Sequence, residues 1–222
     1  MSYRRTENVA RRLAERRDTI IEAAGALAAE GGMAAVQIAP VAARAGIAAG
    51  TVYRYFPSKT ELVAAVMAAV SERELAAMRA AADRAPGPLS ALAAAVTTFA
   101  ARALQRRRLA WAAIAEPVDA DIDAVRLAYR HALAGELEKR LAACVRAGRL
   151  PEQDVKVSAA AVMGALVEGL LGPVAPDTAT SNGRPRAAVQ ALTLFALRAV
   201  GIVDARARGL VVQSAMPEPD AP

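Results

Sequence analysis

Residues 37–62 read QIAPVAARAGIAAGTVYRYFPSKTEL, and this stretch decides the fold of the N-terminal part of the chain. Short apolar segments at about residues 38–45 and 49–55 flank Gly46, and glycine accepts the positive φ of a tight turn at little cost. Two short helices joined by a turn of this kind form a helix-turn-helix unit. Ser58 and Glu61 have the spacing of a capping box, which predicts that the next helix begins at Lys59.

The two short helices have apolar residues with which they can pack against each other: Ile38, Val41, Ala42, Ile47 and Val52. Thr51, Tyr53, Arg54 and Tyr55 are then free to face outward. A DNA major groove offers acceptors to arginine, methyl groups to aromatic rings and phosphates to hydroxyls. The pattern therefore favours DNA binding, although either tyrosine could instead pack onto the preceding helix.

This run resembles the signature of the tetracycline-repressor (TetR) family. The residues that carry the resemblance are Ala45, Gly46, Ile47, Gly50, Thr51, Val52, Tyr53, Tyr55, Phe56, Ser58, Lys59 and Leu62. It covers residues 17–65, and the rest of the chain is similar in helix number and length. The resemblance implies a ligand-responsive repressor that binds a palindromic operator as a homodimer and is released by a small apolar or amphipathic effector. A transcriptional activator of the same fold is the alternative.

The resemblance also implies which residues contact double-stranded operator DNA: Gln37, Arg44, Ala49, Gly50, Thr51, Tyr53, Arg54, Tyr55 and Lys59. In such a complex Tyr53 and Lys59 would grip phosphates, and Thr51, Arg54 and Tyr55 would lie near base edges. Arg44 could equally be a solvated side chain. Two positions depart from the family pattern. Ala48 replaces the usual capping serine, which costs about 1 kcal/mol, and Pro40 lies in the first turn of its helix, where a missing N–H is tolerated.

Composition predicts an all-α protein, because alanine, leucine, arginine and glutamate favour helix. Apolar periodicity and helix breakers along the chain predict about nine helices. We expect a helix-turn-helix domain over residues 1–60, with its first helix beginning at about Arg11 after a frayed start. A helix over about 58–83 links it to a ligand-binding and dimerisation domain over 61–204. The remaining helices are expected at about 89–107, 109–115, 119–147, 155–171 and 186–200. Residues 205–222 are expected to be a disordered tail.

Charge is concentrated at the N-terminus. The formal net charge is +6, and nine basic and five acidic side chains through Lys59 place +4 of it in the first 59 residues. A basic head on a nearly neutral body suggests a polyanionic partner. A solvated arginine-rich face is the alternative reading.

The C-terminal body suggests two further sites. Polar and aromatic groups in otherwise Ala-Leu helices are candidates for an effector pocket: Trp111, Glu116, Tyr129, Arg130 and His131. Small residues near 155–172 would allow close helix approach, and the candidate dimer residues are Ala161, Gly164, Ala165, Glu168, Leu192 and Phe195. The apolar helix at 155–171 could instead be the core of the monomer.

Other classes of function have little support in the sequence. His131 and Cys144 are the single histidine and cysteine, and no phosphate loop, metal-ligand cluster or nucleophile motif appears, so we expect no enzyme activity, cofactor or metal. One cysteine, no signal peptide and short apolar stretches favour a bacterial cytoplasmic protein with no membrane contact. A non-specific DNA-packaging protein is a remaining, less favoured alternative.

Overall fold

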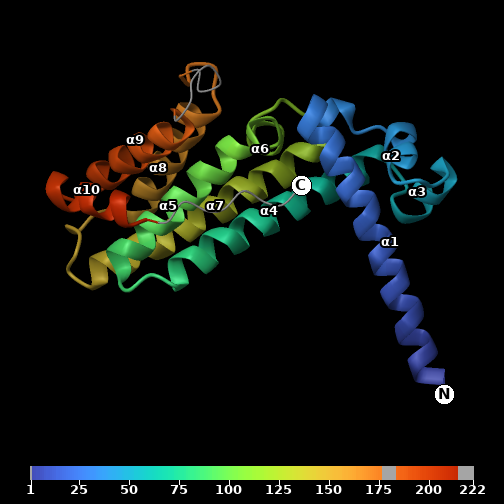
Figure 1. Ribbon diagram of the computed structural model, residues 1–222, viewed down its shortest axis with the longest axis horizontal. Helices are drawn as coiled ribbons and strands as arrows, with labels where there is room; N and C mark the ends of the chain where they lie inside the picture. The colour runs from blue at the N-terminus through green and yellow to red at the C-terminus, as the bar shows by residue number, and fades with distance from the viewer. Residues whose placement is uncertain (1, 177–183, 215–222) are drawn as a thin grey trace.

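The computed structural model describes residues 2–176 and 184–214, which form α-helices and one short 3-10 turn without strands (Figure 1). The helices are α1 (Ser2–Gly31), α2 (Ile38–Arg44), α3 (Ala49–Tyr55), α4 (Lys59–Asp83), α5 (Pro88–Gln105), α6 (Arg107–Ile114), α7 (Ala120–Arg146), α8 (Val155–Leu170), α9 (Arg184–Ala199) and α10 (Asp204–Gln213). The turn η1 (Met33–Ala35) follows α1. The all-α prediction is confirmed.

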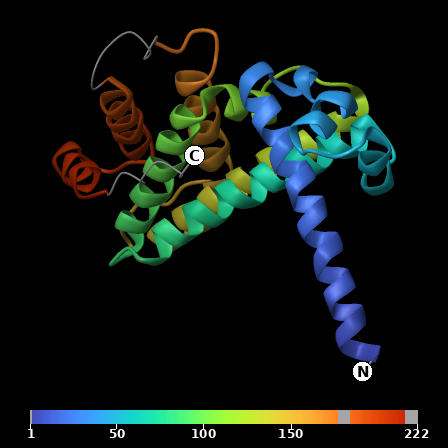
Figure 2. The ribbon, with the colours of Figure 1, turned by 45° about the vertical axis from the view of Figure 1, so that its right-hand side comes forward.

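The helices form a small head and a larger body. In Figures 1 and 2 the head contains α2, α3 and the C-terminal half of α1, and α8, α9 and α10 lie at the opposite end of the molecule. Helix α4 begins in the head and runs along the body, where it packs against α5 and α7. Helices α1 and α4 also contact α6, so α6 joins the body to the head.

The head folds as the sequence predicts. Ile20 and Ala24 of α1 are fully buried one turn apart, and they share a core with Val41 of α2 and Val52 of α3. Gly46 has φ 65°, which ends α2. The N–H of residue 47 bonds to the carbonyl of residue 42 at 3.0 Å, and that of residue 46 bonds to residue 43 at 3.2 Å. This is the hydrogen-bond pattern of a Schellman motif, which fixes the turn.

Helix α1 begins earlier than expected. It starts at Ser2 rather than near Arg11, and its residues 8–19 are all exposed. Asn8 accepts a hydrogen bond from Arg11 at 3.0 Å, and Arg11 pairs with Glu15 one turn on. The prediction of a frayed start was wrong because polarity indicates exposure and does not exclude a helix held by local pairs.

The predicted tail from residue 205 was also partly wrong, since Asp204–Gln213 form α10. Ala207, Leu210 and Val211 are buried with the spacing of one helix face. Asp204 pairs with Arg198 of α9 and with Arg208, and these hydrogen bonds lower the pKa of the Asp204 carboxyl. The rest of the predicted tail, residues 215–222, lies outside the described residues.

Candidate functional site

Helix α3 presents one face to solvent. Ala49, Gly50, Tyr53 and Arg54 are exposed, whereas Val52 is fully buried. Residues three and four apart share a helix face, so these four positions form a single strip. Tyr53 is 53% exposed. An exposed ring, a guanidinium and two residues without bulky side chains suit close contact with a DNA groove.

Thr51 and Tyr55 lie at the edge of this strip. Both are partly buried, and Tyr55 packs against the hydrophobic core. Of the two tyrosines that the sequence placed toward DNA, Tyr53 therefore faces solvent while Tyr55 contributes to the packing of the head.

Two helix N-termini lie close to the strip in sequence. Ala48 occupies the N-cap of α3 without a side-chain hydrogen bond, as expected for this position. Ser58 caps α4 and accepts a hydrogen bond from the Glu61 N–H at 3.1 Å, as predicted. Lys59, in the first turn of α4, is exposed. Helix N-termini favour anions, so this edge of the head suits phosphate.

Two predicted DNA contacts are already engaged within the protein. Arg44 donates to both carboxylate oxygens of Glu30, at 2.6 and 2.9 Å, and these bonds lower the pKa of the Glu30 carboxyl. Arg44 is therefore paired with Glu30 of α1 through two hydrogen bonds, and its contact with DNA stays a prediction. Gln37 is exposed and donates to the carbonyl of Ala34 at 3.0 Å.

The N-terminal part of α1 is a feature that sequence reasoning missed. It projects away from the head and body (Figure 2) and carries arginines at positions 11, 12, 16 and 17. Arg17 lies over the Phe56 ring, 5.2 Å from its centroid, which links the base of this extension to the end of α3. The charge of the N-terminal residues was noted from the sequence, but its placement on a projecting helix follows from the length of α1.

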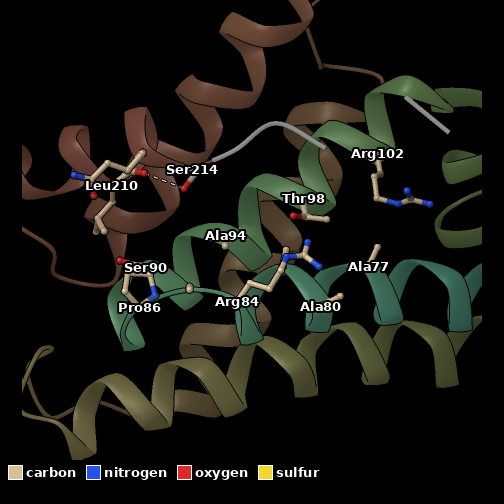
Figure 3. Close-up of a pocket in the computed structure, with 13 residues that line it drawn as sticks. Ala77, Ala80, Arg84, Pro86, Ser90, Ala94, Thr98, Arg102, Leu210 and Ser214 are labelled. Carbon is tan, nitrogen blue, oxygen red and sulfur yellow. Dashed lines mark hydrogen bonds between the residues drawn. The ribbon is translucent and has the colours of Figure 1, made fainter. Parts of the chain in front are cut away.

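An open cleft of about 670 Å³ lies between α4, α5 and α10 (Figure 3). Ala77, Ala80 and Ala94 give it apolar walls, and the Arg84 side chain points into it. The hydroxyl-bearing Thr98 also lines the cleft. The sequence analysis did not single out this cleft, because alanines carry no recognisable binding signal.

A second, much smaller cavity lies inside the body around Tyr129. Its space of about 20 Å³ holds about one water molecule, and Phe99, Ile114 and the paired Glu74 and Arg102 also line it. Burial raises the pKa of the Tyr129 hydroxyl, so the group remains protonated and can donate a hydrogen bond. Tyr129 was a predicted pocket residue, and the structure places it in the wall of this cavity.

The other predicted pocket residues are dispersed. Trp111 is partly buried and packs against the core. Arg130 and His131 are exposed, because successive helix residues point about 100° apart and Tyr129 takes the inward position. Glu116 faces the head instead of a pocket: it accepts a hydrogen bond from the Met33 N–H at 3.1 Å. The expectation that these residues form one site is therefore not supported.

The predicted dimer residues fall on and beside one surface of α8 and α9. Ala161, Gly164 and Glu168 are exposed one turn apart on α8, and Ala165 is partly buried. Phe195 of α9 is 54% exposed. We call these exposed residues of the two helices the α8–α9 face: Ala161, Gly164, Glu168 and Phe195.

Leu192 has a role inside the monomer. Its Cδ2 would lie 2.8 Å from a Cβ added at Gly169, so the missing side chain of this glycine lets α9 approach α8 closely.

Neither a metal-binding cluster nor a membrane-spanning helix is present among the described residues. Residues 2–176 and 184–214 contain no group of three or more His, Cys, Asp or Glu side chains arranged to hold a metal ion. Within the same residues, no helix combines the length and the apolar character that crossing a membrane requires.

Comparison with known proteins agrees with the geometry of the head. Residues 20–66 match the model for bacterial regulatory proteins of the tetR family. The head of this chain is therefore similar to the N-terminal region of that family. The match covers the buried face of α1, the helix-turn-helix and the start of α4.

Curated relatives match over a short part of the chain. The transcriptional repressor KstR of Rhodococcus jostii (strain RHA1) is 52% identical over 59 residues, which are 27% of this chain and 28% of that protein. KstR of Mycobacterium tuberculosis is 51% identical over 53 residues, 24% of each chain. The match thus spans less than a third of the length of these TetR-type repressors.

Solved structures are similar over the whole fold. RolR in complex with resorcinol has a TM-score of 0.65 at 23% identity and covers 95% of this chain and 100% of its own. FadR from Bacillus subtilis, in complex with stearoyl-CoA, has a TM-score of 0.69 at 19% identity and covers 83% and 98%. At these identities the comparison establishes a shared all-helical fold.

Proposed function

We propose that the protein is a ligand-responsive transcriptional repressor that binds a palindromic operator as a homodimer. The exposed strip of α3 is the observation that carries this proposal. Tyr53, Arg54 and Lys59 belong to residues 20–66, which match the model for bacterial regulatory proteins of the tetR family. The projecting arm of α1 adds arginines that can reach flanking phosphates.

The α8–α9 face is the proposed dimer interface. Small exposed residues on α8 allow a second helix to approach, and the exposed Phe195 ring offers apolar area for burial. A two-fold arrangement of these helices would form a four-helix contact and pair two heads for two half-sites.

We propose that a small apolar or amphipathic effector binds in the body and releases the operator. The cavity at Tyr129 offers an apolar lining, a buried ion pair and a hydroxyl donor, and it would have to widen around an effector because its space of about 20 Å³ holds about one water molecule. RolR and FadR were solved with an aromatic ligand and an acyl-CoA, respectively. We also propose that the protein works in the bacterial cytoplasm and binds its effector without chemical change.

The test is binding of the purified protein to the intergenic DNA beside its own coding region. We expect a defined footprint on a palindrome and an affinity that falls steeply with salt. Tyr53→Ala should weaken operator binding by at least tenfold, and Leu127→Ala, on the exposed face of α7, is the matched control. Equal affinity for operator and scrambled DNA would refute sequence-specific recognition.

Transcription in vitro separates the repressor from an activator of the same fold. A repressor lowers transcript yield from the adjacent promoter and an activator raises it. Mass spectrometry of the effector after incubation tests whether it leaves the protein unchanged.

A further inference from the structure

A second open cleft of about 670 Å³ lies at the junction of head and body, between α1, α4 and the start of α6. Four arginines line it, and we call it the arginine cleft: Arg73, Arg106, Arg107 and Arg108. It lies apart from the exposed strip of α3 and from the α4–α5–α10 cleft in Figure 3, with which it shares no lining residue. Neither DNA recognition by α3 nor dimerisation accounts for this concentration of cations.

The arginine cleft has an excess of positive charge. Glu22 is the one carboxylate among its lining residues. Arg108 is engaged elsewhere, since it donates to the carbonyl of Gly31 at 3.1 Å and lies 3.8 Å from Glu116. Arg73 and Arg107 make no ion pair or side-chain hydrogen bond with any other described residue. Two guanidinium groups are therefore available to an anion.

The start of α6 adds to this potential. Arg107 is its first residue, and Arg106 at the N-cap supplies no side-chain cap. The first N–H groups of a helix without a cap carry partial positive charge and need an acceptor. Guanidinium groups beside such N–H groups match the oxygen atoms of a phosphate.

The floor of the arginine cleft is apolar. Ile21, Ala26, Ala29 and Val66 line it, and Gly25 leaves open space where a side chain would stand. Val70, Arg106 and Leu109 line both this cleft and the much smaller cavity at Tyr129. An apolar group lying on the floor would therefore point toward the interior of the body.

We propose that the arginine cleft binds an amphiphilic small molecule that carries a phosphate group. Arg73 and Arg107 hold the phosphate, and the apolar part lies along α1 and α4 toward Leu109. This inference names the chemical class of the effector, so its regulatory meaning rests on the proposed function. Binding itself does not require DNA and is tested without it.

The test is calorimetric titration of the full chain at constant ionic strength with three probes: decyl phosphate, inorganic pyrophosphate and decanol. We expect decyl phosphate to bind most tightly, because it uses both the arginines and the floor. Pyrophosphate binding as tightly as decyl phosphate would indicate a simple anion site, and decanol binding as tightly would indicate an apolar one. Either result overturns the proposal.

Variants then locate the site. Arg73→Gln combined with Arg107→Gln should weaken decyl phosphate binding by at least tenfold, whereas Arg149→Gln, an exposed arginine far along the chain in the α7–α8 connection, should leave it within twofold. Gly25→Met fills the cleft and keeps every charge, so it should also weaken binding, with Gly25→Ala as its control. Unchanged affinity in the double arginine variant or in Gly25→Met overturns the assignment.

A DNA-binding experiment with the same variant distinguishes this inference from the proposed function. The double arginine variant should bind the operator normally when no ligand is present. If it loses affinity for DNA and keeps its affinity for decyl phosphate, the arginines serve the DNA backbone and the proposal is wrong. A protein that binds decyl phosphate in the arginine cleft but no operator would refute the proposed function alone.

Discussion

The carboxylate of Glu116 accepts a hydrogen bond from the backbone N–H of Met33, 3.1 Å away and 83 residues earlier in the chain. Glu116 follows the end of α6 and Met33 begins η1 in the head, so the bond joins body to head. Arg108 reinforces it, because its guanidinium donates to the carbonyl of Gly31 and lies near Glu116. Movement of α6 would therefore act directly on the end of α1.

Loss of this bond should loosen the head. Met33 is 4% exposed, so in Glu116→Ala its N–H loses a partner in a site with little access to water. An unsatisfied buried donor costs about 1–3 kcal/mol. We expect the free energy of unfolding in urea to fall by this amount and amide exchange at Met33 to accelerate. Glu152→Ala, at an exposed carboxylate, should change neither measurement, and an unchanged exchange rate in Glu116→Ala would show that the bond is not formed in solution.

A side chain at position 32 should lower the free energy of unfolding. Its φ is +77°, and a Cβ there would lie 2.6 Å from both the Arg108 guanidinium and the Glu116 carboxylate. Gly32 also has ψ −174°, a backbone region almost confined to glycine, where the strain alone costs about 1–3 kcal/mol, so we expect Gly32→Ala to lower the free energy of unfolding by at least that much in urea titrations. Gly25→Ala is the contrasting change, because it meets open space in mid-helix and should raise stability by about 0.5–1 kcal/mol. Equal effects of the two substitutions would contradict the geometry at Gly32.

The helix-turn-helix could be predicted from the sequence because its determinants are local. Gly46 sets the turn, Ser58 caps α4, and the apolar spacing of α2 and α3 lies within one short stretch. Tyr53 could be placed on the exposed side of α3 for the same reason. The start of α1 and the presence of α10 were misjudged because polar composition was taken as a sign of disorder.

Residues with distant partners could not be assigned from the sequence. Glu116 looked like a pocket group until the fold brought Met33 to it, and Arg44 looked free until α1 placed Glu30 beside it. The arginine cleft is formed by side chains of α1, α4 and the start of α6. The run Gln105–Arg108 alone therefore does not reveal its apolar floor. Side-chain chemistry identifies candidates, but tertiary packing decides which of them are already paired.

Dimerisation should depend on Phe195. The ring is 54% exposed on the α8–α9 face, and an aromatic ring buries a large apolar area when an interface covers it. Phe195→Glu would place two like charges near the proposed two-fold axis, so we expect a monomer by analytical ultracentrifugation and loss of operator binding. Leu127→Glu, on the exposed face of α7, should remain dimeric. A dimeric Phe195→Glu variant would place the interface elsewhere.

Cys144 should be inert in the folded protein and should report on unfolding. The side chain is fully buried in α7, and burial raises the pKa of the thiol to about 11 from its usual 9.0. The reactive form is the thiolate, and a shift of two units lowers its population at pH 8 by about 100-fold even before access is considered. We expect modification by a chromogenic disulfide reagent at pH 8 to be at least that much slower in buffer than in denaturing urea.

The raised pKa of the Cys144 thiol also has a consequence for stability. Because the thiol of the unfolded chain ionises at lower pH than that of the folded protein, raising the pH from 9 toward 11 should progressively lower the free energy of unfolding.

Glu152→Cys supplies an exposed thiol in the same chain, so this variant should consume one equivalent of reagent rapidly in buffer and the second only in urea. Rapid consumption by the unsubstituted protein in buffer at pH 8 would show that α7 opens on the timescale of the reaction.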